Sequence, residues 1–112
     1  MGLRSLLVAG AFSLVAAGQA AFAQSVDAAA AEALMKNSGC FTCHAVDRQK
    51  VGPPFKETAA KYKGKPDAEK TLYTHLTTNP KVKVGGSEEQ HDSLKSTNEA
   101  EIKNVVGWIL SR

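Results

Sequence analysis

The sequence predicts an all-α domain, and three observations support that fold class. Apolar residues near the C-terminus recur at the three- and four-residue spacing of an amphipathic helix. Capping residues, glycines and prolines divide the rest of the chain into short helical segments. No alternation of apolar and polar residues is long enough to predict a strand. The length of 112 residues allows one domain and excludes a large multidomain enzyme.

Residues 1–23 are predicted to be a signal peptide that is cleaved off. Arg4 supplies a positive start, an apolar run follows over residues 6–17, and Ala21-Phe22-Ala23 fits a signal peptidase site. The run is too short to cross a hydrocarbon core of about 30 Å comfortably as an anchor. We therefore expect an exported, periplasmic domain over residues 24–112, with no membrane span once the signal is removed.

Two short helices are predicted in the first half of this domain. Asp27 can cap a helix over residues 28–37, and Gly39 is a typical residue just beyond a helix end. Pro53-Pro54 precede a second helix, which runs from Phe55 to about Lys63.

A third helix and a loop are predicted in the middle. Pro66-Asp67 opens the helix, Leu72 and Leu76 lie on one of its faces, and Asn79-Pro80 ends it. Residues 81–97 show little periodicity, and the diglycine within them indicates a flexible bend rather than a strand.

The last helix has the strongest pattern in the sequence. Asn98, with Glu101 three residues later, forms a capping signature. Gly107 inside the helix costs about 1 kcal/mol in helix propensity, which predicts a close crossing with another helix. The apolar positions that follow helical spacing are Ile102, Val105, Val106, Ile109 and Leu110.

The predicted domain is small for a self-sufficient core. A chain of this size buries only about two-thirds of its unfolded surface. Exported proteins often compensate with disulfides, but Cys40 and Cys43 are too close in sequence to join distant segments. A large buried apolar cofactor would supply the missing core.

The segment Cys40-Phe-Thr-Cys43-His44 predicts which cofactor that is. Two thiols three positions apart on a helical turn can form thioethers with the two vinyl groups of one haem. The histidine directly after Cys43 is then held beneath the iron as its proximal axial ligand.

The cysteine pair also fits three other interpretations. A thioredoxin-like redox pair normally lies in a βαβ setting, which this sequence lacks. A structural zinc site needs four ligands, whereas only two cysteines are present. The third interpretation is a local disulfide between Cys40 and Cys43. The coincidence of the motif with an export signal and a small core favours covalent haem.

From about Val26 to Ser111, the sequence resembles the small bacterial class I cytochromes c. The resemblance implies a fold of four or so short helices around one haem, with the first and last helices crossing beside it. It also implies that the Pro53 carbonyl accepts the other ring N–H of His44. The segments that carry it are Cys40-Phe-Thr-Cys43-His44, Val51-Gly-Pro-Pro-Phe55, Ala59-Ala-Lys-Tyr-Lys-Gly64 and Val105-Val-Gly-Trp-Ile-Leu110.

The sequence departs from that family at the sixth iron position. Most relatives have a methionine ligand in the loop before the last helix, but none is present in this loop. His91 stands there instead, and imidazole is a strong haem ligand. We therefore predict His91 as the distal ligand. The alternatives are a site with no strong protein ligand, or ligation by His75, Lys83, Lys95 or Met35, although Met35 has the spacing of a core residue.

Two functions follow from a haem domain of this kind. The first is transfer of single electrons, which suits full axial ligation. The second is binding of a small gas or anion at an open or labile sixth site. No paired carboxylates, nucleophile–base pair or phosphate loop is recognisable, so we do not expect an enzyme.

Charge along the sequence suggests the kind of partner. Residues 48–65 carry six basic side chains against Glu57 alone, a local charge of +5, and residues 87–101 have a local charge of −4. Such segments fit either ordinary solvated helix faces or a dipole that steers the haem edge toward an acidic redox partner. The formal net charge of +3 is too small to predict nucleic-acid binding. The protein is expected to be a monomer or a small subunit of a larger oxidoreductase.

Overall fold

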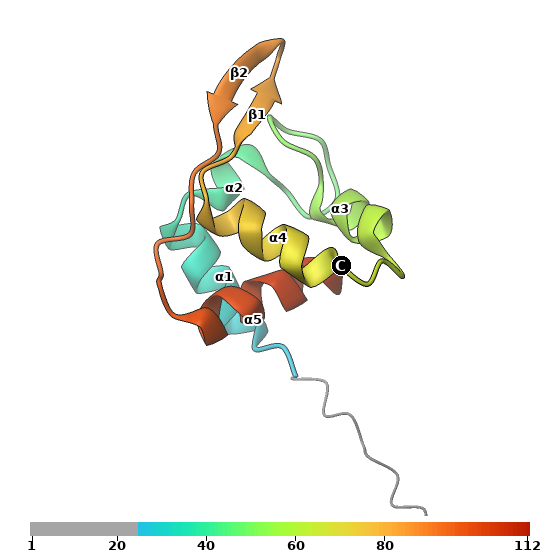
Figure 1. The fold of residues 1–112 in the computed structure, drawn as a ribbon, viewed down its shortest axis with the longest axis vertical. Coiled ribbons are helices and arrows are strands. Elements are labelled where there is room, and N and C mark those ends of the chain that lie inside the picture. Colours follow the sequence, from blue (N-terminus) through green and yellow to red (C-terminus); the bar gives the residue numbers. More distant parts are fainter. Residues whose placement is uncertain (1–24) are drawn as a thin grey trace, which may run out of the picture.

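The structure is a computed structural model that describes residues 25–112. The predicted signal peptide and its cleavage site lie outside the described residues. Five helices and one hairpin follow one another along the chain (Figure 1). They are α1 (Ala28–Asn37), α2 (Cys40–Cys43), α3 (Phe55–Tyr62), α4 (Ala68–Thr77), β1 (Lys81–Val84), β2 (Ser87–Gln90) and α5 (Glu99–Leu110).

The last helix, α5, is the centre of the core, because α1, α3 and α4 all pack against it. Its apolar face is buried as its spacing predicts, and Val105 is completely inaccessible to solvent. The other buried residues of α5 are Ile102, Val106, Trp108 and Ile109.

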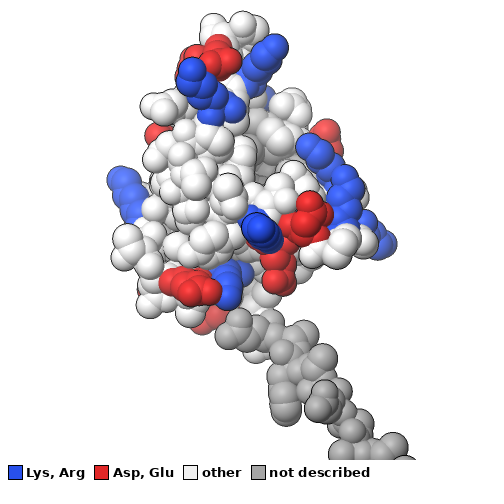
Figure 2. All heavy atoms as spheres, viewed as in Figure 1, with Lys and Arg blue, Asp and Glu red and all other residues white. Residues whose placement is uncertain are grey.

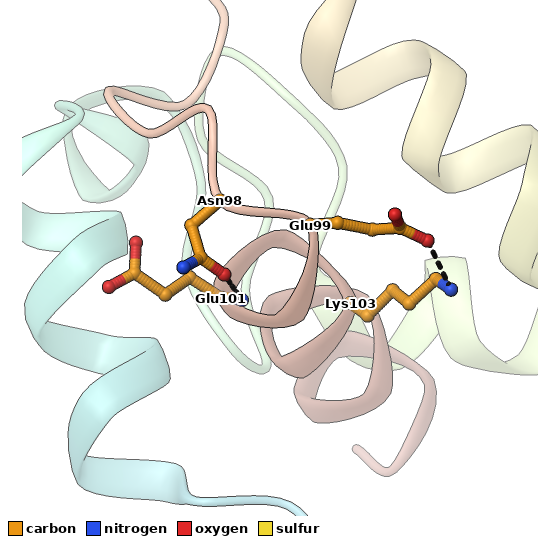
Figure 3. A network of polar contacts seen from close by, with 4 residues as sticks. All are labelled: Asn98, Glu99, Glu101 and Lys103. Carbon is orange, nitrogen blue, oxygen red and sulfur yellow. Dashed lines mark hydrogen bonds and ion pairs between the residues drawn. The ribbon is translucent and has the colours of Figure 1, made fainter.

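The N-terminal ends of α1 and α5 have the caps that the sequence predicts. The side chain of Asn98 accepts a hydrogen bond from the Glu101 N–H at 3.1 Å, and that of Asp27 accepts from the Ala30 N–H at 3.0 Å. Figure 3 shows the Asn98 cap beside the ion pair of Glu99 with Lys103, one turn apart on α5. These contacts satisfy N–H groups that have no partner within the helix.

The contact between α1 and α5 ties the two ends of the domain together. The Asp27 N–H donates to Asn104 Oδ1 at 2.9 Å, and Asn104 Nδ2 donates to Asp27 O at 2.8 Å. A Cβ atom at Gly107 would lie 3.0 Å from a methyl group of Val26. The close approach predicted at Gly107 therefore exists, but its neighbour is the segment just before α1.

Met35 belongs to this interface, with an exposed fraction of 1%. Replacing it with alanine should lower the free energy of unfolding by about 2–5 kcal/mol, because the cavity cannot fully collapse. Leucine has nearly the same volume and should cost less than about 1.5 kcal/mol. Denaturant unfolding of the complete protein measures both. Equal stability of Met35→Ala and the parent protein would contradict a core role.

The expectation that residues 81–97 contain no strand was wrong. β1 and β2 pair antiparallel through the turn at Gly85-Gly86, with Lys81 opposite Gln90. Both glycines have positive φ angles, 56° and 88°, as tight hairpin turns require. The hairpin extends away from the helices (Figure 1), and every residue of β2 is exposed. It is an addition to a helical domain, so the all-α fold class stands.

No helix within residues 25–112 is long and apolar enough to cross a membrane.

Candidate functional site

The helical turn α2 and the loop after it fold back on each other. The Gly52 N–H donates to Cys43 O at 2.7 Å, and the Phe55 N–H donates to Ala45 O at 2.9 Å. These two backbone bonds close the loop. They place residues 52–55 directly beside the His44 ring.

The His44 ring is fixed on three sides. Its Nδ1 lies 2.8 Å from Pro53 O, and because a carbonyl oxygen only accepts, Nδ1 must carry the proton. The Phe55 ring stacks on His44 at a centroid distance of 5.2 Å. A Cβ atom at Gly52 would lie 2.3 Å from His44 Cε1, so only glycine fits there. In this tautomer Nε2 has a free lone pair with which to bind a metal ion.

His91 lies immediately after β2, on the segment that returns from the hairpin to α5. Its ring centroid is 6.1 Å from that of His44. The His75 ring, on α4, lies 4.3 Å from that of His91. The fold thus gathers three histidines that are far apart in the sequence.

Burial lowers the pKa of His91, and the nearby His44 lowers it further, against a raising contribution from Asp92. Burial likewise lowers the pKa of His75, assisted by His91. Both rings therefore favour the neutral form, which is the form that ligates metals. His91 Nδ1 is buried and has no hydrogen-bond partner among the described residues. A ring that the protein leaves unsatisfied in this way fits a site built for a further group.

The remaining candidate ligands lie in other surroundings. Met35 is enclosed in the α1–α5 core. Lys83, on β1, and Lys95, between β2 and α5, are exposed.

The cysteines do not have the surroundings of a redox pair. Cys40 and Cys43 are half-buried free thiols, and burial raises the pKa of Cys40. Reactive Cys-x-x-Cys pairs have a lowered thiol pKa, so this environment argues against a thioredoxin-like activity. Within residues 25–112, no group of three or more His, Cys, Asp or Glu side chains is placed to hold a metal ion by itself.

Sequence analysis missed two residues that shape the site. Gly52 lies in the segment Val51-Gly-Pro-Pro-Phe55, which supports the family resemblance. Nothing in the sequence indicates that its backbone contacts the His44 ring. Asn79 was interpreted only as a helix stop. Its side-chain amide donates to His91 O at 3.0 Å. An asparagine before proline is a common turn signal, which does not reveal a partner twelve residues away.

This helical domain presents two thiols and an imidazole on one turn, and the ring centroid of a second imidazole lies 6.1 Å from that of the first. These are attributes of a c-type haem protein. The family model for cytochrome c matches residues 28–112. The chain belongs to the cytochrome c family, and it has the class I fold with one covalent haem c for which Cys40 and Cys43 fit the attachment motif.

The relatives are small proteins of similar length. The chain is 40% identical over 83 residues to cytochrome c-551 of Azotobacter vinelandii, covering 71% of this chain and 94% of the relative. It is 37% identical over 100 residues to cytochrome c-551 of Pseudomonas aeruginosa, covering 89% and 92%. Among solved structures, the class 1 cytochrome MtoD of Sideroxydans lithotrophicus ES-1 superposes with a TM-score of 0.75 at 45% identity, covering 78% of this chain and 97% of that one.

Proposed function

We propose that this protein is a periplasmic carrier of single electrons in which His44 is the proximal and His91 the distal ligand of the haem iron. The observation that carries the proposal is the pair of imidazoles, His44 and His91, whose ring centroids lie 6.1 Å apart. Imidazoles held on both sides of the haem would let the iron supply one-electron chemistry with no change in its protein ligands.

The spacing of the two rings supports this assignment. Metal–nitrogen bonds to histidine are about 2 Å long, so two imidazoles on opposite sides of one ion have ring centroids roughly 6 Å apart. The centroids of His44 and His91 are 6.1 Å apart.

The bound haem supplies the redox-active iron, and the surrounding residues set its properties. Pro53 holds the proton on His44 Nδ1, which keeps Nε2 directed to the metal and raises the basicity of the ring. Phe55 and Gly52 restrict rotation of the same ring. With imidazole in place of a thioether at the distal position, the midpoint potential should lie below that of His/Met proteins.

Absorption and electron paramagnetic resonance spectra of the complete, haem-loaded protein test this proposal. We expect low-spin signals of nitrogen–nitrogen ligation in the ferric state and slow binding of carbon monoxide in the ferrous state. A high-spin spectrum with prompt, stoichiometric carbon monoxide binding would overturn it and would favour the gas- or anion-binding alternative.

The periplasmic location is inferred from the predicted signal peptide over residues 1–23.

A basic surface over α3 is the proposed docking site for an acidic redox partner. Figure 2 shows Lys and Arg side chains lined up along the edge of the molecule where α3 lies. Lys56 is exposed on this surface and directly follows Phe55, which stacks on His44. Positive charge close to His44, on the proximal side of the haem, would attract acidic partners and orient them.

Substituting Lys56→Glu tests the docking surface. With ferricyanide as an anionic probe, we expect oxidation of the ferrous protein to slow several-fold at low salt, since attraction becomes repulsion. The difference should vanish at high salt because of screening. Lys36→Glu, an equal charge change at the end of α1, is the control and should have a smaller effect. Equal slowing by both variants would show that only net charge matters.

A further inference from the structure

Two hydrogen bonds close the base of the hairpin, and both end on the backbone of His91. The His91 N–H donates to Pro80 O at 2.8 Å. Asn79 Nδ2 donates to His91 O at 3.0 Å. The two polar backbone groups of His91 are thus both bonded to the residues that precede β1.

Asn79 adopts an unusual conformation to make its contact. Its φ angle is 47°, and among the described residues other than glycine it is the one with positive φ. A following proline normally pushes a residue toward extended backbone, so this conformation is strained. Strain of that kind persists only where the surrounding structure enforces it.

The segment after His91 is held by separate contacts. The Leu94 N–H donates to Leu76 O at 3.0 Å, and Leu94 itself is buried. The Lys95 N–H donates to Ser38 Oγ at 2.9 Å. On this side His91 is therefore secured to the helical core.

On the hairpin side the restraint is different. β2 is exposed over its whole length and gives no apolar packing to hold the backbone of His91. The two hydrogen bonds at the hairpin base must do this, and one of them depends on a side chain.

We infer that Asn79 is a positioning residue for His91: its side-chain amide holds the hairpin base closed and thereby limits how often His91 leaves the iron. This inference rests on the distal ligation proposed above. It predicts a change in the rate of ligand exchange with no change in which ligand is bound at rest.

The test compares two substitutions that separate the amide from the backbone conformation. Asn79→Gly keeps the left-handed conformation without strain and removes the amide. Asn79→Asp keeps the shape but replaces the donor with an acceptor facing the His91 carbonyl. A neutral hydrogen bond contributes about 0.5–1.5 kcal/mol, so cyanide should bind to the ferric protein roughly threefold to tenfold faster in both variants. Both resting spectra should remain low-spin.

Thr78→Ala is the matched control. Thr78 is the adjacent exposed residue, and its hydroxyl donates to Thr74 O at 2.7 Å, away from His91. Loss of the Thr78 hydroxyl should leave the rate of cyanide binding to the ferric protein within twofold of the parent rate. Unfolding in guanidinium chloride, followed on the same proteins, separates faster ligand exchange from general loss of stability.

The outcomes distinguish this inference from the proposed function. A low-spin parent protein with unchanged cyanide rates in both Asn79 variants would overturn the role of Asn79 alone. Equally faster cyanide binding in Thr78→Ala would also overturn the role of Asn79. A high-spin parent protein would overturn the distal ligation and the role of Asn79 together.

Discussion

Replacing His91 with alanine should convert the ferric protein from low spin to high spin and let the ferrous protein bind carbon monoxide promptly. The substitution removes the imidazole whose ring centroid lies 6.1 Å from that of His44. It leaves a methyl group, which cannot ligate iron. Absorption and electron paramagnetic resonance spectra of the purified, haem-loaded variant measure the change. A spectrum identical to that of the parent protein would remove His91 from the proposed site.

His75→Ala is the control for this experiment, because the His75 ring lies only 4.3 Å from that of His91. Leu72 and Leu76 are both buried and hold α4 in the core, so in His91→Ala the His75 ring should not move to the iron in place of His91. The His75 variant should therefore stay low-spin. A high-spin His75→Ala together with a low-spin His91→Ala would assign the distal position to His75.

The second large effect is expected at Gly52. An alanine methyl group there would lie 2.3 Å from His44 Cε1 and 2.7 Å from Nδ1, far inside van der Waals contact. Either the ring or the loop must shift, which should lower the free energy of unfolding by about 1–3 kcal/mol. The shift should also weaken the hydrogen bond from His44 to Pro53. Denaturant unfolding and the haem absorption spectrum report the two effects.

The neighbouring position gives a matched control. Val51 has an exposed fraction of 54%, so Val51→Ala should change the free energy of unfolding by no more than about 0.5 kcal/mol. If Gly52→Ala were as stable as Val51→Ala and had the parent spectrum, the close packing of Gly52 on His44 would be refuted.

Local chemistry in the sequence was enough to predict the helices. Asp27 and Asn98 cap α1 and α5 because their side chains satisfy N–H groups that any helix start leaves free. The apolar spacing of α5 predicts its buried face because burial of one stripe is what keeps a short helix folded. These signals act within one or two turns and do not depend on the rest of the fold.

The hairpin was missed because its strands have little of the usual pattern. β1 alternates lysine with half-buried valine over only four residues, and β2 is entirely polar. Its main signal was the Gly85-Gly86 turn, which equally fits a flexible bend. Strands of this length are specified by their pairing, which becomes visible only in three dimensions.

The candidate site was predictable where its residues are close in sequence. The run from Cys40 to His44 specifies the haem attachment chemistry within five positions. Other contacts of the site arise from the path of the chain between α4 and α5. They are the close approach of the His75 and His91 rings and the hydrogen bond from Asn79 to His91. Such contacts have no periodicity that a single sequence could reveal.

The central place of α5 bears on how the protein is made. It follows the other four helices along the chain, and among residues 25–112 it is the element against which α1, α3 and α4 all pack. A nascent chain therefore stays open until α5 has emerged. During that interval Cys40 and Cys43 remain accessible to whatever catalyses thioether formation, so late arrival of α5 gives cofactor attachment time to precede closure of the core.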